Sequence, residues 1–261
     1  MNQPREIALN YINVAKAKTS MAWYKILILA VMAGIFIALG AALATIASAG
    51  LTGGTALLVK GAVFPLGLIL VTLCGAELFT GNNLLIAPVL SRDVKITAML
   101  RNWGIAYGGN LIGSVFIAVL VVFGNVYSGA SADAGVAVAA AKSTAAFADT
   151  FVRGILCNML VCLAVWAAMS SKSAGGKVIA LYMPVFAFVV CGFEHSVANM
   201  YYLSAGLMSS AFYGIPAAFN VGDSLLYCLL PSTLGNIIGG TLIAVAYWTV
   251  YLKGKNKSNV E

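Results

Sequence analysis

The stretch CGFEHSVANMYY, residues 191–202, places the protein's only histidine, His195, beside Glu194 inside an otherwise apolar segment. Polar groups in such surroundings are costly unless they are hydrogen-bonded. Gly192 precedes the pair and Asn199 follows it, which favours a helix that is broken at membrane depth over a continuous span. This stretch is therefore the first candidate for a functional site.

The composition identifies a membrane protein. Of the 261 residues, 61% are hydrophobic and 9% are charged, whereas roughly a quarter of an average soluble domain is charged. The apolar runs are continuous and therefore unlike the alternating strands of a β-barrel, and each is long enough for a helical span of about 20 residues. We predict an all-α integral membrane protein with six transmembrane helices, the second and fifth interrupted, at residues 25–49, 61–86, 103–123, 147–169, 178–203 and 225–252.

Three regions follow from this division. Residues 1–24 are predicted to be a cytoplasmic amphipathic segment, residues 25–252 a single six-helix channel domain, and residues 253–261 a basic cytoplasmic tail. In the first region, the helical spacing of apolar residues is consistent with a helix that lies on the membrane or against a partner. A simple basic anchor is the other interpretation. The apolar residues are Ile7, Ala8, Tyr11, Ile12, Val14 and Ala15.

The net charge of +7 is a topology signal. Most lysines and arginines flank the spans on the side of the two termini, and only Lys60, Lys142 and Arg153 fall at or near the other side. Because basic loops stay in the cytoplasm, we expect both termini there, in a multi-pass protein of the cell (inner) membrane, and we expect no nucleic-acid partner. The five cysteines lie in apolar runs without zinc spacing, so we expect no metal site, cofactor or disulfide.

Two short motifs occur twice in the same order. CGAELFTGN at residues 74–82 matches CGFEHSVAN at residues 191–199, and GNLIGS at residues 109–114 matches GNIIGG at residues 235–240. Each half then has three spans, and an odd number forces the second copy to enter the membrane in the opposite orientation. Such inverted repeats commonly place the transport site where interrupted helices meet, which predicts a pore between the first pair of motifs.

His195 is the central pore candidate. A neutral imidazole donates one hydrogen bond, and a protonated one attracts an anion or passes it a proton. A histidine that only fixes the broken helix is the alternative. Glu77 and Glu194 hold equivalent positions, where a carboxylate can accept backbone N–H groups freed at a helix break, so we favour structural roles for both and for Asn82. A proton relay is the other interpretation of the two glutamates.

Lys142 lies in a long, small-residue-rich connection that we expect to pack back into an external vestibule. A lysine there would attract anions, although a solvated charge is equally consistent with the sequence. No nucleophile, base and orienting carboxylate can be grouped, so the protein is not expected to be an enzyme. An intramembrane enzyme that uses His195 and Glu194 nevertheless remains an alternative, as does a water or small neutral-solute channel. The paired Asn-Pro-Ala motifs expected of aquaporins are absent.

Taken together, these motifs resemble the formate/nitrite transporter family. The resemblance runs along nearly the whole chain through GAELFTGN, the lone Lys142, GILCNMLVCLAVW at residues 154–166, GFEHSVANMYY and LGNIIGG. It implies an aquaporin-like fold, a homopentamer with one pore in each protomer, and transport of small monovalent anions such as formate, nitrite or hydrosulfide. It also implies a set of pore and constriction residues: His195, Thr80, Asn199, Lys142 and Asn158 in the pore, with Phe64, Leu68, Leu78 and Phe188 narrowing it on either side.

Substrate choice stays open among these three anions. The first motif reads ELFTGNN, whereas formate-channel members resemble DLFTS at this place, so hydrosulfide competes with formate. Two routes for the anion are also open. It either takes a proton near His195 and crosses as the neutral acid, or stays charged and is held by hydrogen bonds.

Overall fold

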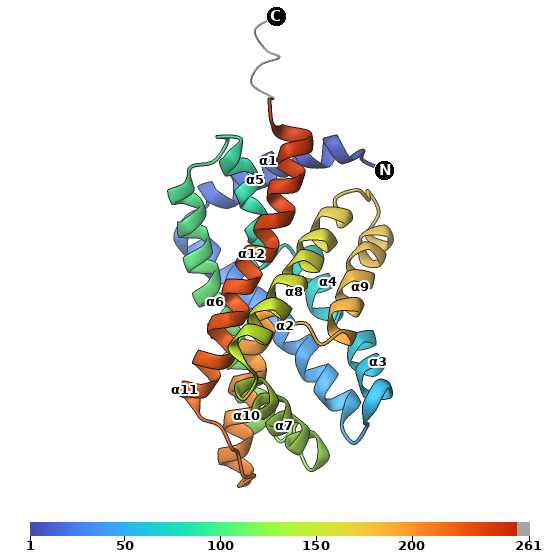
Figure 1. Cartoon of the computed structure of the whole chain (residues 1–261), viewed down its shortest axis with the longest axis vertical. Coiled ribbons are helices and arrows are strands. Elements are labelled where there is room, and N and C mark those ends of the chain that lie inside the picture. Colours follow the sequence, from blue (N-terminus) through green and yellow to red (C-terminus); the bar gives the residue numbers. More distant parts are fainter. Residues whose placement is uncertain (255–261) are drawn as a thin grey trace, which may run out of the picture.

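The computed structural model describes residues 1–254, and all regular structure within them is helical (Figure 1). The predicted basic tail at residues 253–261 lies almost entirely outside this range. The elements are α1 (Pro4–Ser20), α2 (Trp23–Ser48), α3 (Gly53–Val63), α4 (Leu66–Leu73), η1 (Gly81–Leu85), α5 (Ile86–Leu90), α6 (Ile96–Phe123), α7 (Ala130–Ser143), α8 (Phe147–Ala168), α9 (Ala174–Val190), α10 (Ser196–Tyr213), α11 (Val221–Asp223), η2 (Ser224–Leu229), α12 (Leu230–Tyr247) and η3 (Trp248–Leu252).

Five helical stretches in the described part of the chain are long and apolar enough to cross a membrane. Two shorter apolar helices, Gly81–Leu90 and Ala174–Val190, border the interruptions. The predicted second span is divided into α3, α4 and the η1–α5 segment, and the predicted fifth span into α9 and α10. The five long stretches are Trp23–Ser48, Gly53–Leu73, Ile96–Phe123, Phe147–Ala168 and Val221–Leu252.

Glycine starts both interruptions. After α4 the chain turns at Gly75, with φ of 76°, and after α9 it turns at Gly192, with φ of 67°. This left-handed conformation is strained for residues with a Cβ atom, and both glycines directly follow the C-cap of a helix, where glycine is favoured. The two matching motifs thus begin with the same backbone turn, which ends one half-helix and sends the chain inward.

Close backbone contacts hold the long helices together in two pairs, α2 with α6 and α8 with α12. A Cβ atom on Gly113 of α6 would lie 2.1 Å from the Val31 carbonyl oxygen, and one on Gly239 of α12 would lie 2.1 Å from the Ile155 carbonyl oxygen. Small residues allow this approach, which is typical of helix pairs in membranes. The second pair of matching motifs therefore supplies the packing faces of both helix pairs.

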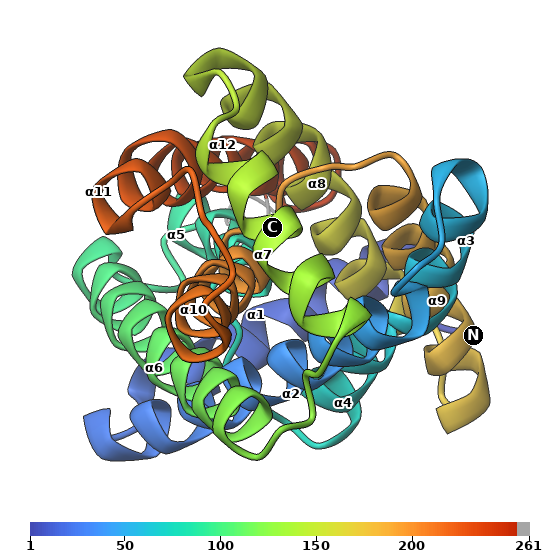
Figure 2. The same cartoon turned by 90° about the horizontal axis from the view of Figure 1, so that it is seen from below.

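Helices α1 and α7 lie at opposite ends of the molecule (Figures 1 and 2). The C-terminal end of η3 lies at the same end as α1 (Figure 1). The predicted helix near the N-terminus is present, and it packs against the rest of the chain. Its buried residues are Ile7, Ala8, Tyr11, Ile12, Ala15 and Thr19. Val14, predicted to belong to the apolar face, is instead 38% exposed.

We expect the substitution Gly113→Ala to destabilise the protein, because its Cβ atom has no room against Val31. Overpacking of this kind costs about 1–3 kcal/mol. Gly108→Ala on the same helix is the matched control, because its Cβ atom would meet nothing within 4 Å. Thermal unfolding in detergent measures both variants. Equal melting temperatures for Gly113→Ala and the control would contradict the packing described above.

Candidate functional site

Two cavities approach the centre of the molecule from opposite ends. The α7-side cavity, about 160 Å³ in volume, is lined by His195, Phe64 and Phe188, with Lys142 from α7. The α1-side cavity, about 420 Å³, is lined by residues that include Leu68 and Leu78, with Lys18 from α1. Thr80 is fully buried and lines neither cavity.

Thr80 and His195 meet at the centre, where one comes from each interruption. Thr80 Oγ1 lies 2.8 Å from His195 Nε2, while His195 Nδ1 accepts a hydrogen bond from the Ala198 backbone N–H at 3.1 Å. Because Nδ1 is an acceptor, the neutral ring carries its proton on Nε2 and donates it to Thr80. His195 is thereby the N-cap of α10, and the hydroxyl proton of Thr80 is left for another acceptor.

Asn110 and Asn236 hold the two interruptions in matching ways. Asn110 Oδ1 accepts from the Phe79 backbone N–H at 2.9 Å, and its Nδ2 donates to the carbonyl oxygens of Ala30 and Glu77. Asn236 Oδ1 accepts from the Ser196 N–H at 2.8 Å, and its Nδ2 donates to the carbonyl oxygens of Gly154 and Glu194. Each amide satisfies two backbone groups of an interruption that a continuous helix would have paired internally, and its third bond ties the interruption to α2 or α8.

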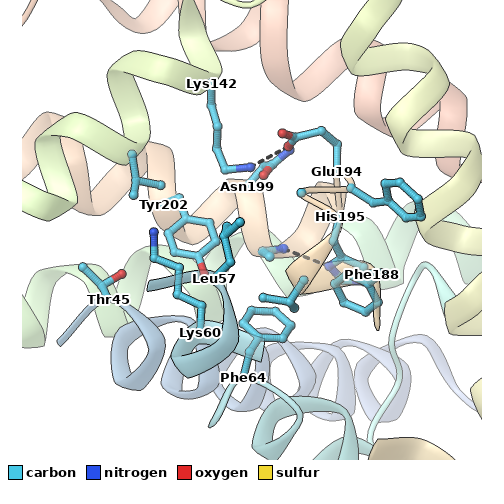
Figure 3. Close-up of a pocket in the computed structure, with 15 residues that line it drawn as sticks. Thr45, Leu57, Lys60, Phe64, Lys142, Phe188, Glu194, His195, Asn199 and Tyr202 are labelled. Atoms are coloured by element: carbon cyan, nitrogen blue, oxygen red, sulfur yellow. Dashed lines mark hydrogen bonds and ion pairs between the residues drawn. The ribbon is translucent and has the colours of Figure 1, made fainter. Parts of the chain in front are cut away.

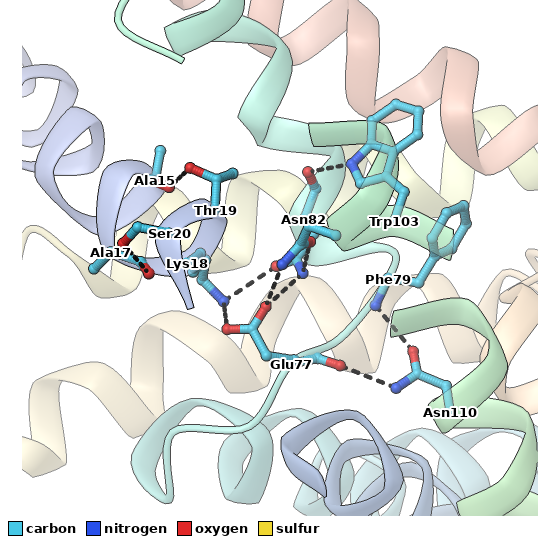
Figure 4. A network of polar contacts seen from close by, with 11 residues as sticks. Ala15, Ala17, Lys18, Thr19, Ser20, Glu77, Phe79, Asn82, Trp103 and Asn110 are labelled. Atoms are coloured by element: carbon cyan, nitrogen blue, oxygen red, sulfur yellow. Dashed lines mark hydrogen bonds and ion pairs between the residues drawn. The ribbon is translucent and has the colours of Figure 1, made fainter. Parts of the chain in front are cut away.

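A half-buried lysine, a buried glutamate and a buried asparagine form a group beside each interruption. On the α1 side, Glu77 accepts from Lys18 at 2.7 Å and from Asn82 at 2.8 Å (Figure 4). On the α7 side, Glu194 accepts from Lys142 at 2.6 Å and from Asn199 at 2.9 Å (Figure 3). Asn102 also donates to Glu77, at 3.2 Å.

The electrostatics of the α7-side group keep its lysine charged. Burial lowers the pKa of the Lys142 ammonium, but the Glu194 carboxylate beside it more than offsets this effect, and the net pKa is raised. Lys142 also lies 5.5 Å from the centroid of the Tyr202 ring, within cation–π range. Lys142 is therefore a paired cation in the cavity wall rather than a solvated surface charge.

The residues that make these contacts recur in the same order in the two halves of the chain. A shift of 124 residues relates Ala30 to Gly154, and Lys18 to Lys142. The interruptions match at a shift of 117 and the glycine-rich helices at a shift of 126, as with Gly113 and Gly239. The correspondence thus includes α1 and α7, which precede the first and fourth predicted spans.

Comparison with known proteins agrees with the family resemblance of the sequence motifs along nearly the whole chain. The sequence model described as "Formate/nitrite transporter" matches residues 5–249. The chain belongs to the formate/nitrite transporter family. It is 37% identical to the "Probable formate transporter" of Methanothermobacter thermautotrophicus, over 96% of this chain and 97% of the relative. It is 36% identical to formate channel FocA of Escherichia coli, over 86% of each chain.

Solved structures of the family share the fold. A chain titled "FNT family ion channel" aligns with a TM-score of 0.81 and 30% identity, over 94% of this protein and 97% of that chain. A chain titled "Pentameric formate channel with formate bound" aligns with a TM-score of 0.77 and 34% identity, over 88% and 98% respectively. This family member is therefore a multi-pass membrane transport protein, and it is not an enzyme.

The other residues that the family resemblance singles out lie close to the centre. Phe64 and Phe188 meet edge to face with ring centroids 5.8 Å apart on the α7 side, and Leu68 and Leu78 line the α1 side. Asn158 lines neither cavity; it is fully buried, and its Nδ2 donates to the Thr80 carbonyl oxygen at 3.2 Å.

Reasoning from the sequence missed three contacts in this family member. Asn110 and Asn236, rather than the carboxylates of Glu77 and Glu194, receive the backbone N–H groups at the interruptions. The sequence carries a signal for both asparagines, since they lie at the same position of the repeated GN motif. Lys18 is one of several basic residues near the N-terminus, and its spacing from Lys142 carries no visible motif.

We expect Asn110→Leu and Asn236→Leu to destabilise the transporter to a similar extent, about 2–4 kcal/mol each, because each leaves one N–H and one C=O group of an interruption without this partner. Thr241→Val is the control, because its hydroxyl bonds only to the preceding turn of its own helix. Thermal unfolding in detergent measures the three variants. A large loss for one asparagine and none for the other would show that the matching contacts are not equivalent in energy.

Proposed function

We propose that this protein carries small monovalent anions, namely formate, hydrosulfide or nitrite, passively or linked to protons, through a pore in each protomer. One observation carries the proposal. The Thr80–His195 pair lies between two cavities, His195 lines one of them, and each cavity is lined by a half-buried lysine and by apolar side chains. The names of the relatives support the substrate class.

The proposed path runs from the α7-side cavity past Phe64 and Phe188, then His195 and Thr80, then Leu68 and Leu78. An anion that enters this apolar passage loses its hydration, which is costly unless hydrogen bonds replace it or a proton neutralises it. At the centre, the Thr80 hydroxyl is the free donor, and the His195 Nε2–H can turn to the permeant when it leaves Thr80 Oγ1. Neutral His195 then acts as a donor to the permeant, and its protonation would require the Ala198 bond to break.

The roles of the remaining residues follow from their contacts. Lys142 and Asn199 line the α7-side cavity, where the anion enters. Glu77, Glu194 and Asn82 support the interrupted backbone by pairing with their own lysine and asparagine neighbours. Asn158 donates a hydrogen bond to the Thr80 carbonyl oxygen. We therefore propose that it holds Thr80 in position and does not contact the permeant anion.

We also propose the architecture of the assembly. The matching contacts and the opposite placement of α1 and α7 support two inverted repeats in an aquaporin-like six-helix domain (Figure 1). The pentameric formate channel of the same fold supports a homopentamer in the lipid bilayer. The excess of basic residues at the α1 end supports cytoplasmic termini in the inner membrane, with residues 1–24 covering the cytoplasmic mouth. The alternative of a water or neutral-solute channel is not favoured, because the relatives named above are formate transporters and channels.

Replacement of His195 tests the mechanism. His195→Phe removes both the donor to Thr80 and the N-cap of α10, whereas His195→Asn retains a capping acceptor. We expect the flux of formate, nitrite or hydrosulfide into proteoliposomes to fall by about tenfold in both variants, which corresponds to one hydrogen bond to a charged group. Only His195→Phe should also lose about 1 kcal/mol of stability through the cap.

The same proteoliposomes test the function itself. Wild-type flux of the three anions, measured against pH, identifies the substrate and separates passive from proton-linked transport, while stopped-flow water flux tests the alternative. Unchanged flux and pH dependence in both histidine variants would remove His195 from the mechanism. Water flux without anion flux would overturn the proposed function.

A further inference from the structure

Each cavity contains a second lysine besides the one paired with glutamate. Lys60 of α3 lines the α7-side cavity together with Lys142, and Lys177 of α9 lines the α1-side cavity together with Lys18. A shift of 117 residues relates Lys60 to Lys177, and the same shift relates the two interruptions. The second lysine is thus part of the repeated arrangement at both mouths.

The charges of the two lysines in a cavity are not equivalent. Within residues 1–254, the ion pairs are Lys16–Asp93, Lys18–Glu77 and Lys142–Glu194, so Lys60 and Lys177 have no acidic partner in that range. A lysine 2.6 Å or 2.7 Å from a carboxylate forms a neutral pair, whose field weakens rapidly with distance. The net positive charge of each cavity lining is therefore that of its second lysine.

Lys60 is positioned before the narrow part of the path. Leu57 lies three residues before Lys60 on α3, and Phe64, the C-cap of α3, lies four residues after it. Both line the same cavity as Lys60, so this face of α3 is turned toward the cavity. Four residues correspond to about 6 Å along a helix. In the view of Figure 3, Lys60 rises from α3 toward Tyr202, which lies between it and Lys142.

We propose that Lys60 and Lys177 form the anion-binding subsites at the two mouths, and that each attracts the small monovalent anion before it reaches the apolar passage. This inference rests on the proposed function. Lys142 and Lys18, in contrast, mainly neutralise the carboxylates that support the interruptions. An unpaired charge in a cleft raises the local concentration of an oppositely charged substrate by a factor of 10 or more, and salt weakens the effect.

The test is formate entry into vesicles of defined orientation. We expect Lys60→Gln to raise the half-saturating formate concentration for entry from the α7-side mouth by about tenfold and to remove most of its salt dependence. Entry from the α1-side mouth should remain within twofold of wild type. Lys177→Gln should give the mirror-image result, and Lys60→Arg should restore wild-type behaviour because it keeps the charge.

Lys172→Gln is the matched control, because this exposed lysine lies five residues before Lys177 and lines neither cavity. Size-exclusion profiles identify misfolded variants, and Lys60→Arg then supplies the comparison at an intact fold. If wild type carries formate but Lys60→Gln keeps its half-saturation and salt dependence at both mouths, the lysine assignment is wrong and the proposed function stands. If wild type carries no formate, nitrite or hydrosulfide, both are overturned.

Discussion

The structure depends on the requirement that backbone groups be hydrogen-bonded away from water. Two helices of this protein stop inside an apolar environment, and each interruption exposes N–H and C=O groups that no solvent can satisfy. Asn110 and Asn236 each satisfy one N–H and one C=O group of an interruption and tie it to a neighbouring helix. The interruptions can then bring Thr80 and His195 together at the centre.

The polar groups around the centre divide into two kinds. Charged groups form two ion pairs, Lys18 with Glu77 and Lys142 with Glu194. The opposite charges in each pair cancel, and the pair orders the chain around its interruption. The Thr80 hydroxyl and the histidine Nε2–H are neutral donors held in place by the capping bond to Ala198. Under the proposed function, neutral and fixed donors suit an anion that must leave again, since a full charge at the centre would hold it too strongly.

The main features of the fold were predictable because they depend on local patterns. Hydrophobic runs located the helices, and the pairs Gly75 with Gly192 and Glu77 with Glu194 located both interruptions. The partners of the glutamates were not predictable, because Lys18 and Lys142 lie 59 and 52 residues away in the chain. The equivalence of α1 and α7 was missed for a similar reason, since their sequences share little beyond one lysine in register.

The changing shift between equivalent residues records where the two halves have gained or lost chain length. It falls from 124 to 117 between the α2–α8 pair and the interruptions, then rises to 126 at the α6–α12 pair. Helix length accounts for most of the difference, since α2 has 26 residues and α8 has 22, and α10 has 18 residues where η1 and α5 have 5 each. The connections at residues 49–52 and 214–220 lie outside these helices and are mostly exposed, so an epitope or a fluorescent label inserted there would leave the buried contacts intact.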